Sequence, residues 1–323
     1  AFTYPFANVP LWEDKVSHPE KIKCPALVVA SYTNTLHSNG TFRAWRALGS
    51  KEKWLRIHDS QEWPDYYSEK SQQERLKFFD HYLKGIDNGW EKTPVVQYSL
   101  LDMEGNNETG IAAYSFPPEG TSYHKLFLNG GTRVMTEQNT PVDIPAQVPT
   151  VHMPPFVPQA SFLYTVKERT EMIGYPKLKL WVETKETDDM DIFVLVQKLD
   201  RSGNVMKEIT IPNQSARIHD NGDYGATITV YPGPNGILRL SMRHLDEEKA
   251  TDIHPVYTFD RSEKLVPGEI VPVEVELSPI GLVLKPGESL RLIVSTRNIL
   301  GNMMPLNQPY IPQNKGFLVI HSG

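Results

Sequence analysis

The chain has 323 residues, enough for two domains that each bury a core, and a formal net charge of −6. No basic run accompanies this acidic balance, so we expect neither nucleic acid nor an anionic membrane as a partner. No apolar stretch reaches the roughly 20 residues that a membrane-spanning helix needs. The single cysteine, Cys24, excludes an internal disulfide and a multi-cysteine metal site.

The start of the sequence indicates a piece of a longer protein. It has no initiating Met, and residues 1–23 mix aromatic, proline and charged residues. We interpret them as a connector packed on a sheet, with part of a substrate-covering cap as the alternative. The α/β pattern that follows would be small on its own, because buried parallel strands need neighbours on both sides. We therefore expect an upstream part of the same protein as a partner.

The first predicted strand covers residues 26–31, an apolar run rich in β-branched residues, typical of a strand buried in a parallel sheet. A polar loop follows over residues 32–40. Thr41 is then expected to cap a helix that ends at Gly49.

The same pattern repeats once more. A second strand is predicted over residues 53–57, a second polar loop over 58–65, and a long helix over 65–84 that Gly85 closes. Three apolar residues share one face of that helix: Leu76, Phe79 and Leu83. In open α/β sheets the ligand and catalytic groups lie on loops beyond the carboxyl ends of the strands, which here are the two polar loops.

The sequence after Gly85 is β-rich, with turn signals every 8 to 12 residues or so, as in a β-sandwich. The Pro-rich interval from Pro141 to Pro158 is interpreted as a long surface loop. We therefore predict an α/β plus all-β chain, with one domain over residues 1–93 and a sandwich over 94–323. The predicted sandwich strands are residues 95–101, 124–128, 161–166, 177–183, 192–196, 237–242, 271–277, 290–294 and 317–320.

Several segments in this order carry a family resemblance: TFRAWRAL, FFDHYLKG and LKPGESLRLIVS. From about Trp12 to its end, the chain resembles the C-terminal part of the cocaine esterase, α-amino-acid ester hydrolase and X-Pro dipeptidyl-peptidase family. The resemblance implies part of an α/β-hydrolase domain followed by a jelly-roll (galactose-binding-like) sandwich. It also implies cleavage of esters or amides by a Ser-His-Asp triad in the chain order Ser, Asp, His.

The triad positions depart from the family pattern. The acid position, on the loop after the first strand, is Asn34. An amide can orient an imidazole but supplies no charge, which in a serine protease costs about 10⁴ in kcat. The histidine position is Gln61 by gapless counting, with His58 three residues before it. No GxSxG or GxSxxG elbow for a nucleophilic serine occurs in the sequence.

Two hypotheses remain open. In the first, the serine lies upstream, and His58 completes an altered triad with Asn34, Asp59 or Glu62; His37, in the same loop as Asn34, is a further candidate. In the second, the chain belongs to a degenerate branch that acts as a non-catalytic ligand-binding or scaffold protein. Catalysis predicts that Asn34 and His58 face one pocket between the domains, whereas binding predicts exposed aromatics on a concave face of the sandwich.

The remaining expectations concern ligands and location. We expect no cofactor and no metal, since the acidic run over residues 186–191 lacks a regular spacing of calcium ligands. The substrate class implied by the resemblance is a small-molecule ester, an amide or a short peptide. A homo-oligomer is compatible with the sequence. The sequence leaves the compartment open, with the cytoplasm as the working expectation.

Overall fold

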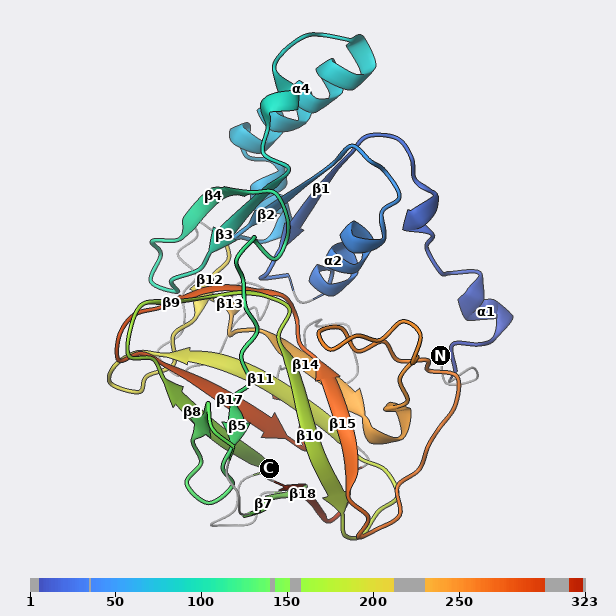
Figure 1. The fold of residues 1–323 in the computed structure, drawn as a ribbon, viewed down its shortest axis with the longest axis vertical. Coiled ribbons are helices and arrows are strands. Elements are labelled where there is room, and N and C mark those ends of the chain that lie inside the picture. Colours follow the sequence, from blue (N-terminus) through green and yellow to red (C-terminus); the bar gives the residue numbers. More distant parts are fainter. Residues whose placement is uncertain are drawn as a thin grey trace.

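The structure is a computed structural model, and it describes residues 6–34, 36–139, 143–151, 158–211, 230–299 and 314–321. An α/β sheet with helices lies at one end of the molecule, and a β-sandwich forms the larger part (Figure 1). Among the described residues, no helix has the length and apolarity needed to span a bilayer. The minor elements are α1 (Pro10–Glu13), η1 (Pro19–Lys21), η2 (Trp90–Lys92), β5 (Phe127–Leu128), β6 (Met135–Thr136) and η4 (Leu240–Met242).

The α/β sheet has four strands in the order β1 (Ala26–Ser31), β2 (Lys53–His58), β3 (Val96–Leu100) and β4 (Glu108–Ala113). The first three strands are parallel and β4 is antiparallel to β3. Both predicted α/β strands are confirmed, although β2 runs on to include His58. The strand expected to begin the sandwich, β3, joins this sheet instead. The division at residue 93 stays a prediction, and one sheet runs across it.

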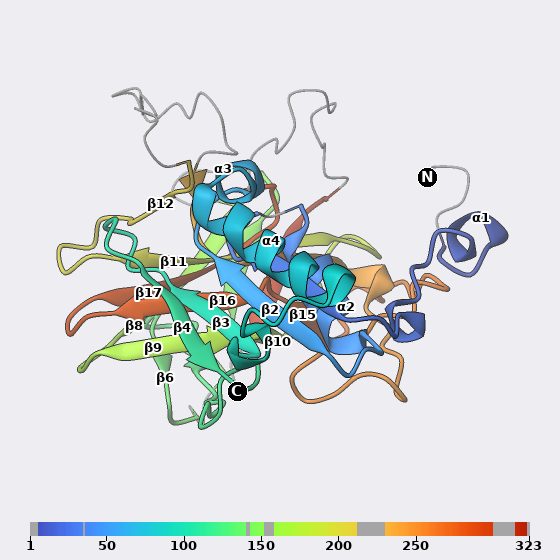
Figure 2. The same ribbon diagram turned by 90° about the horizontal axis from the view of Figure 1, so that it is seen from above.

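Alternate residues of β2 face opposite layers, because side chains along a strand have a period of two. Leu55 and Ile57 belong to the main core together with Phe42 of α2 (Ser38–Ala47). Trp54 belongs to a second cluster with Phe78 of α4 (Glu69–Lys84). The two helices therefore cover opposite faces of the sheet (Figure 2).

The helix α2 begins at Ser38, so the expected cap at Thr41 is wrong. The Asn34 Oδ1 atom accepts hydrogen bonds from the backbone N–H groups of Leu36 and His37, both at 3.0 Å, and so occupies donors just ahead of the helix. Thr41 instead lies inside the helix, where its Oγ1 donates to the His37 carbonyl at 3.0 Å. Asn34 therefore stabilises the turn that leads into α2, whose own N-cap residue, His37, makes no side-chain cap hydrogen bond.

The predicted long helix is two helices, α3 (Glu62–Tyr66) and α4. Ser68 interrupts them: its backbone is extended and its Oγ accepts from Ser71 N at 3.2 Å, so it caps α4. Gly85 ends α4 in the left-handed conformation, with φ of 68°, as the sequence predicts. The apolar stripe of α4 lies on the surface of the chain, where its residues Leu76, Phe79 and Leu83 are 49%, 50% and 76% exposed.

The sandwich consists of two four-stranded sheets, in the orders β15-β10-β18-β7 and β14-β11-β17-β8. The alternation predicted over 177–183 is confirmed, because Leu178, Leu180 and Val182 of β10 are buried. The bounds of these strands are β7 Ala146–Pro149, β8 Gln159–Thr165, β10 Lys177–Thr184, β11 Asp191–Leu199, β14 Asn235–Arg239, β15 Val271–Glu276, β17 Ser289–Ser295 and β18 Phe317–His321.

One strand lies in the interval expected to be a loop. β7 falls within residues 141–158 and pairs with β18, so the loop interpretation is wrong for 146–149; residues 140–142 and 152–157 lie outside the described part. Ala146 and Val148 are buried, and Pro149 is tolerated because β7 is an edge strand. Several other strands were also not predicted from the sequence: β4, β6, β9 (Thr170–Gly174), β12 (Glu208–Ile209), β13 (Val230–Tyr231) and β16 (Ile280–Leu284).

The KPGE turn has a structural role inside the sandwich. The Glu288 carboxylate accepts from the Lys285 backbone N–H at 2.6 Å and lies 2.9 Å from the Lys198 ammonium, which is fully buried. Lys198 also donates to the carbonyl of Asp102, two residues after the end of β3, at 2.8 Å. The turn, the sandwich strand β11 and the α/β sheet are thereby joined.

Candidate functional site

The two polar loops meet at the carboxyl ends of β1 and β2, whose last residues, Ser31 and His58, are paired in the parallel register. Buried hydroxyl groups join the loops. Ser31 Oγ and Thr33 Oγ1 lie 2.8 Å apart, and they lie 2.8 and 2.9 Å from the Ser60 carbonyl oxygen. Because each hydroxyl group has one proton, one of them donates to the carbonyl while the other donates either to that carbonyl or to the first hydroxyl. The loop after β1 is therefore fixed against the loop after β2.

Asn34 and Gln61, which the sequence predicts at the family acid and histidine positions, are brought into contact. Asn34 Nδ2 donates to Gln61 Oε1 at 3.4 Å. Gln61 is 6% exposed, and its backbone N–H donates to the Thr210 carbonyl at 2.8 Å. Its side-chain Nε2 donates to Thr210 Oγ1 at 3.3 Å. A residue of the sandwich thus holds Gln61 in place.

In the described part of the chain, His58 makes no hydrogen bond to Asn34. It is 7% exposed and shares the face of β2 that carries Trp54 and Arg56, toward α4. Its Nδ1 atom lies 3.4 Å from Ser60 Oγ. Burial lowers the pKa of the His58 imidazole; Asp65 and Asp59 oppose this effect, and Arg56 adds to it. The neutral imidazole is therefore the favoured form.

The carboxylates near His58 have other partners. Arg56 donates to both oxygens of Asp65 at 2.7 Å and to Glu74 at 2.5 Å. These bonds from the guanidinium hold the pKa of the Asp65 carboxyl below its usual value although burial opposes them. Asp59 accepts from Asn107 Nδ2 at 3.0 Å.

The same Asn107 amide nitrogen also donates to Glu208 Oε1, at 2.8 Å. Glu208, on β12, is 5% exposed, and its Oε2 is buried without a hydrogen-bond partner in the described part of the chain. Burial raises the pKa of Glu208 to about 7, with the Asp59 and Asp102 charges adding to the effect. Nothing in the sequence pattern marks Glu208 or Thr210 as neighbours of the second polar loop, because both lie about 150 residues further along the chain.

A histidine–carboxylate pair spans the two loops. His37 Nδ1 lies 2.5 Å from Glu62 Oε1, and the two side chains are 55% and 46% exposed. Both residues were weighed as candidates from the sequence, but only the structure joins them to each other. Across the described ranges, no group of three or more His, Cys, Asp or Glu residues is arranged to hold a metal ion.

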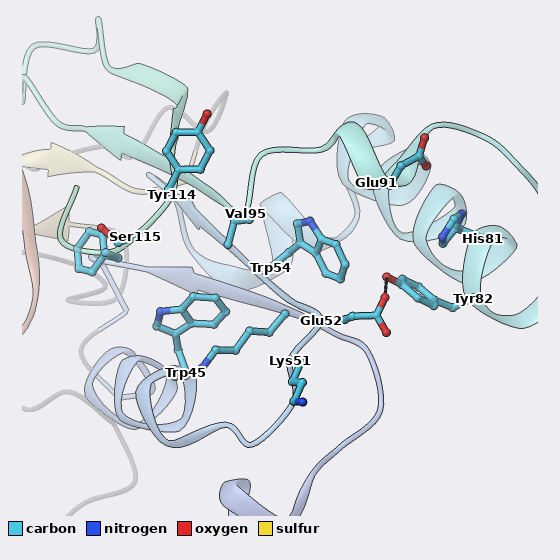
Figure 3. Close-up of a pocket in the computed structure, with 12 residues that line it drawn as sticks. Trp45, Lys51, Glu52, Trp54, His81, Tyr82, Glu91, Val95, Tyr114 and Ser115 are labelled. Carbon is cyan, nitrogen blue, oxygen red and sulfur yellow. Dashed lines mark hydrogen bonds between the residues drawn. The ribbon is translucent and has the colours of Figure 1, made fainter. Parts of the chain in front are cut away.

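A pocket of about 500 Å³ lies elsewhere, near the start of β2 (Figure 3). Its polar groups are partly paired: Tyr82 donates to Glu52 at 3.0 Å, and the Lys53 ammonium lies 4.7 Å from the centre of the Trp45 ring. It excludes Asn34, His58 and Gln61, which lie at the other end of β1 and β2. The lining residues are Trp45, Lys51, Glu52, Lys53, Trp54, His81, Tyr82, Glu91, Val95, Tyr114, Ser115 and Phe116.

Comparisons with known proteins place the chain among hydrolase relatives. A family model described as the X-Pro dipeptidyl-peptidase C-terminal non-catalytic domain matches residues 88–323. Among solved structures, a CocE/NonD family hydrolase from Staphylococcus aureus is 32% identical with a TM-score of 0.87; the match covers 100% of this chain and 56% of that one. The comparison with curated proteins found no match.

Two more distant structures share the fold. An aminopeptidase from a marine sediment Thaumarchaeota archaeon is 15% identical with a TM-score of 0.65, covering 99% of this chain and 56% of that one. An α-amino acid ester hydrolase is 16% identical with a TM-score of 0.60, covering 97% of this chain and 56% of that one. The chain therefore spans little more than half the length of the structures it matches.

Proposed function

The chain belongs to the cocaine esterase, α-amino-acid ester hydrolase and X-Pro dipeptidyl-peptidase family, as its C-terminal part, and we propose that the protein containing it is a serine hydrolase. The reaction is acyl transfer to water, with a small ester, an amide or a short peptide as substrate. The observation that carries the proposal is the contact between Asn34 and Gln61, which joins the two triad positions at the carboxyl ends of β1 and β2.

In this proposal the nucleophile comes from an upstream part of the protein, since no serine elbow occurs in the sequence. Residues 1–93 then form the end of an α/β-hydrolase domain, and residues 94–323 the jelly-roll domain. Two features support an upstream neighbour. In the described chain β1 has a strand partner on one side only, and the apolar stripe of α4 lies exposed.

The roles of the three predicted site residues follow from their contacts. Asn34 orients its neighbours through its amide, and Gln61 links that amide to the sandwich through Thr210. His58 is the proton-transfer candidate that the sequence predicts. Because it is 7% exposed, its transfer of a proton to substrate requires the loop after β2 to move.

The test uses the full-length protein. It is incubated with a fluorophosphonate probe, and the labelled residue is located by mass spectrometry. We expect one serine upstream of this chain to be labelled. Asn34→Ala and Gln61→Ala should slow labelling at least tenfold, whereas the exposed Gln73→Ala on α4 should leave it unchanged. Absence of any labelled serine in the folded, full-length protein contradicts the proposal.

The second candidate is a non-catalytic ligand-binding or scaffold protein of the same fold. The observation that favours it is that both triad positions carry neutral amides, which are satisfied by each other and by Thr210. Under this alternative the full-length protein folds and is not labelled. Substitution of Asn34 or Gln61 then changes its stability and no reaction rate.

A further inference from the structure

The two loops carry a histidine–carboxylate pair, His37 and Glu62, in which the histidine and the acid lie on the opposite loops from those of the family triad. The histidine, His37, lies on the loop after β1, where the family has its acid, and Glu62 lies after β2, where the family has its histidine. The Nδ1–Oε1 distance is 2.5 Å. With side-chain exposures of 55% and 46%, both groups can be reached from outside, unlike His58 at 7%.

Hydrogen bonds of the Asn34 and Gln61 side chains fix the backbone near His37 and Glu62. The His37 N–H donates to Asn34 Oδ1 at 3.0 Å, and Asn34 Nδ2 reaches Gln61, the residue before Glu62. The Gln61 N–H is in turn fixed by the Thr210 carbonyl. His37 and Glu62 therefore follow closely after two residues, Asn34 and Gln61, whose side chains are hydrogen-bonded to each other across the loops.

This geometry suits proton transfer at the remaining ring nitrogen. A carboxylate that accepts from Nδ1–H fixes the imidazole tautomer and stabilises the imidazolium that forms when Nε2 takes a proton. Glu62 supplies the negative charge that Asn34 lacks. In the described part of the chain, His37 Nε2 makes no hydrogen bond, which leaves it available to a reacting group.

We propose that His37, oriented by Glu62, is the proton-transfer histidine of the hydrolase site, an inference that rests on the proposed function. As the upstream serine Oγ attacks the substrate carbonyl carbon, its proton passes to His37 Nε2. His37 then protonates the leaving alcohol or amine as the C–O or C–N bond breaks. In the second half, water gives a proton to His37 and its oxygen attacks the acyl carbon; the proton returns to the serine oxygen as the acyl bond breaks.

The experiment compares four variants in the full-length protein, with fluorophosphonate labelling and p-nitrophenyl acetate hydrolysis as readouts. His37→Ala and Glu62→Gln should lower both rates by about 10²–10⁴, the range for loss of general acid–base catalysis. Added imidazole should partly restore the His37→Ala rate, which a purely structural residue would not allow. His58→Gln tests the competing candidate, since it should abolish labelling if His58 is the proton-transfer residue, and the exposed His18→Gln should match the wild type.

The outcomes distinguish a wrong assignment of His37 from a wrong proposed function. Labelling of the wild type that survives His37→Ala, or that His58→Gln abolishes, overturns the assignment of His37 and leaves the hydrolase function standing. A wild type that is folded but never labelled overturns both. The pairing itself is checked independently by NMR of the His37 imidazole in the present chain: its Nδ1–H signal should be lost or shifted upfield in Glu62→Gln, and an unchanged signal contradicts the pair.

Discussion

Arg56 of β2 holds Asp65 of α3 through two parallel hydrogen bonds of 2.7 Å, one from each terminal nitrogen. Their side chains are only 10% and 12% exposed. The pair fastens α3 to the strand that ends in His58, so it fixes both ends of the segment that carries Gln61 and Glu62. A planar, bidentate pair of this kind is geometrically demanding as well as strong.

Replacement of Asp65 by Asn should destabilise the chain by about 3 kcal/mol, the lower end of the range for breaking a buried ion pair, because Glu74 remains beside Arg56. The Asp65 carboxylate also favours the charged form of His58. Its removal should therefore lower the pKa of His58 further. Urea unfolding measures the first effect and an NMR histidine titration the second, with the exposed Asp87→Asn as control. A pKa of His58 that rises in Asp65→Asn contradicts the electrostatic account.

Glu208 should make stability depend on pH. Its pKa in the folded chain is raised to about 7, above the unfolded value, so the folded state retains a proton that the unfolded state has lost. Stability should consequently fall as pH rises from about 4.5 to 7 and stay lower above that, by an amount of the order of 3 kcal/mol. Glu208→Gln, which cannot ionise, should be more stable than the wild type at pH 8 and similar to it at pH 5.

The control for this measurement is Glu119→Gln, since Glu119 lies exposed on the surface. Its unfolding free energy should follow the wild type at both pH values. If Glu208→Gln loses stability equally at pH 5 and pH 8, then Glu208 acts through packing and hydrogen bonding alone, and the titration account fails.

The buried pair of Lys198 and Glu288 should be essential for folding of the sandwich. Lys198→Met leaves the Glu288 carboxylate buried without its cation and should cost about 3–5 kcal/mol. The double variant Lys198→Met with Glu288→Leu removes both charges and should be less destabilised than Lys198→Met alone. Urea denaturation of the wild type and the two variants tests this order; a double variant less stable than Lys198→Met would refute it.

Gly281 is the point at which β16, a strand that pairs with β9, meets the α/β sheet. A Cβ there would lie 2.5 Å from the Ser99 carbonyl oxygen and 2.5 Å from the ring of Tyr32, which is fully buried. Gly281→Ala should therefore destabilise the chain by about 1–3 kcal/mol, as overpacking does. Because Tyr32 begins the loop that leads to Asn34, labelling of the full-length protein by fluorophosphonate should also slow.

Gly40 supplies the matched control for that glycine. It lies inside α2 with nothing within 4 Å of an added Cβ. Gly40→Ala should raise stability by about 0.5–1 kcal/mol, because alanine loses less backbone entropy in a helix. Thermal unfolding of both variants distinguishes the two effects by sign.

Local patterns in the sequence predicted many of the elements correctly. The apolar run over 26–31 and the alternation over 177–183 are strands, and the glycine after Lys84 ends α4 in the expected conformation. The segments that carried the family resemblance also led to the correct family. These features depend on the chemistry of residues within a few positions of one another, so they can be found without the fold.

Other features were decided by contacts between distant segments. The strand β3 joins the α/β sheet because β2 offers it a parallel partner, and β7 forms because β18 offers it an antiparallel partner at the sandwich edge. The apolar stripe of α4 has helical spacing, yet spacing alone cannot say whether another element covers it. Its residues are exposed in this chain, while the intervening Phe78 is buried against Trp54.

The candidate site also has some features that follow from the local sequence and others that follow from tertiary contacts. The sequence determined that polar loops follow two neighbouring parallel strands, and it predicts Asn34 and Gln61 at the triad positions of the family. Only the tertiary structure decided that these two amides touch, that His58 is buried on the α4 face, and that His37 meets Glu62. The physical reason is that burial and side-chain pairing depend on groups about 25 to 150 residues away, Thr210 and Glu208 among them, whose positions are set by packing of the whole chain.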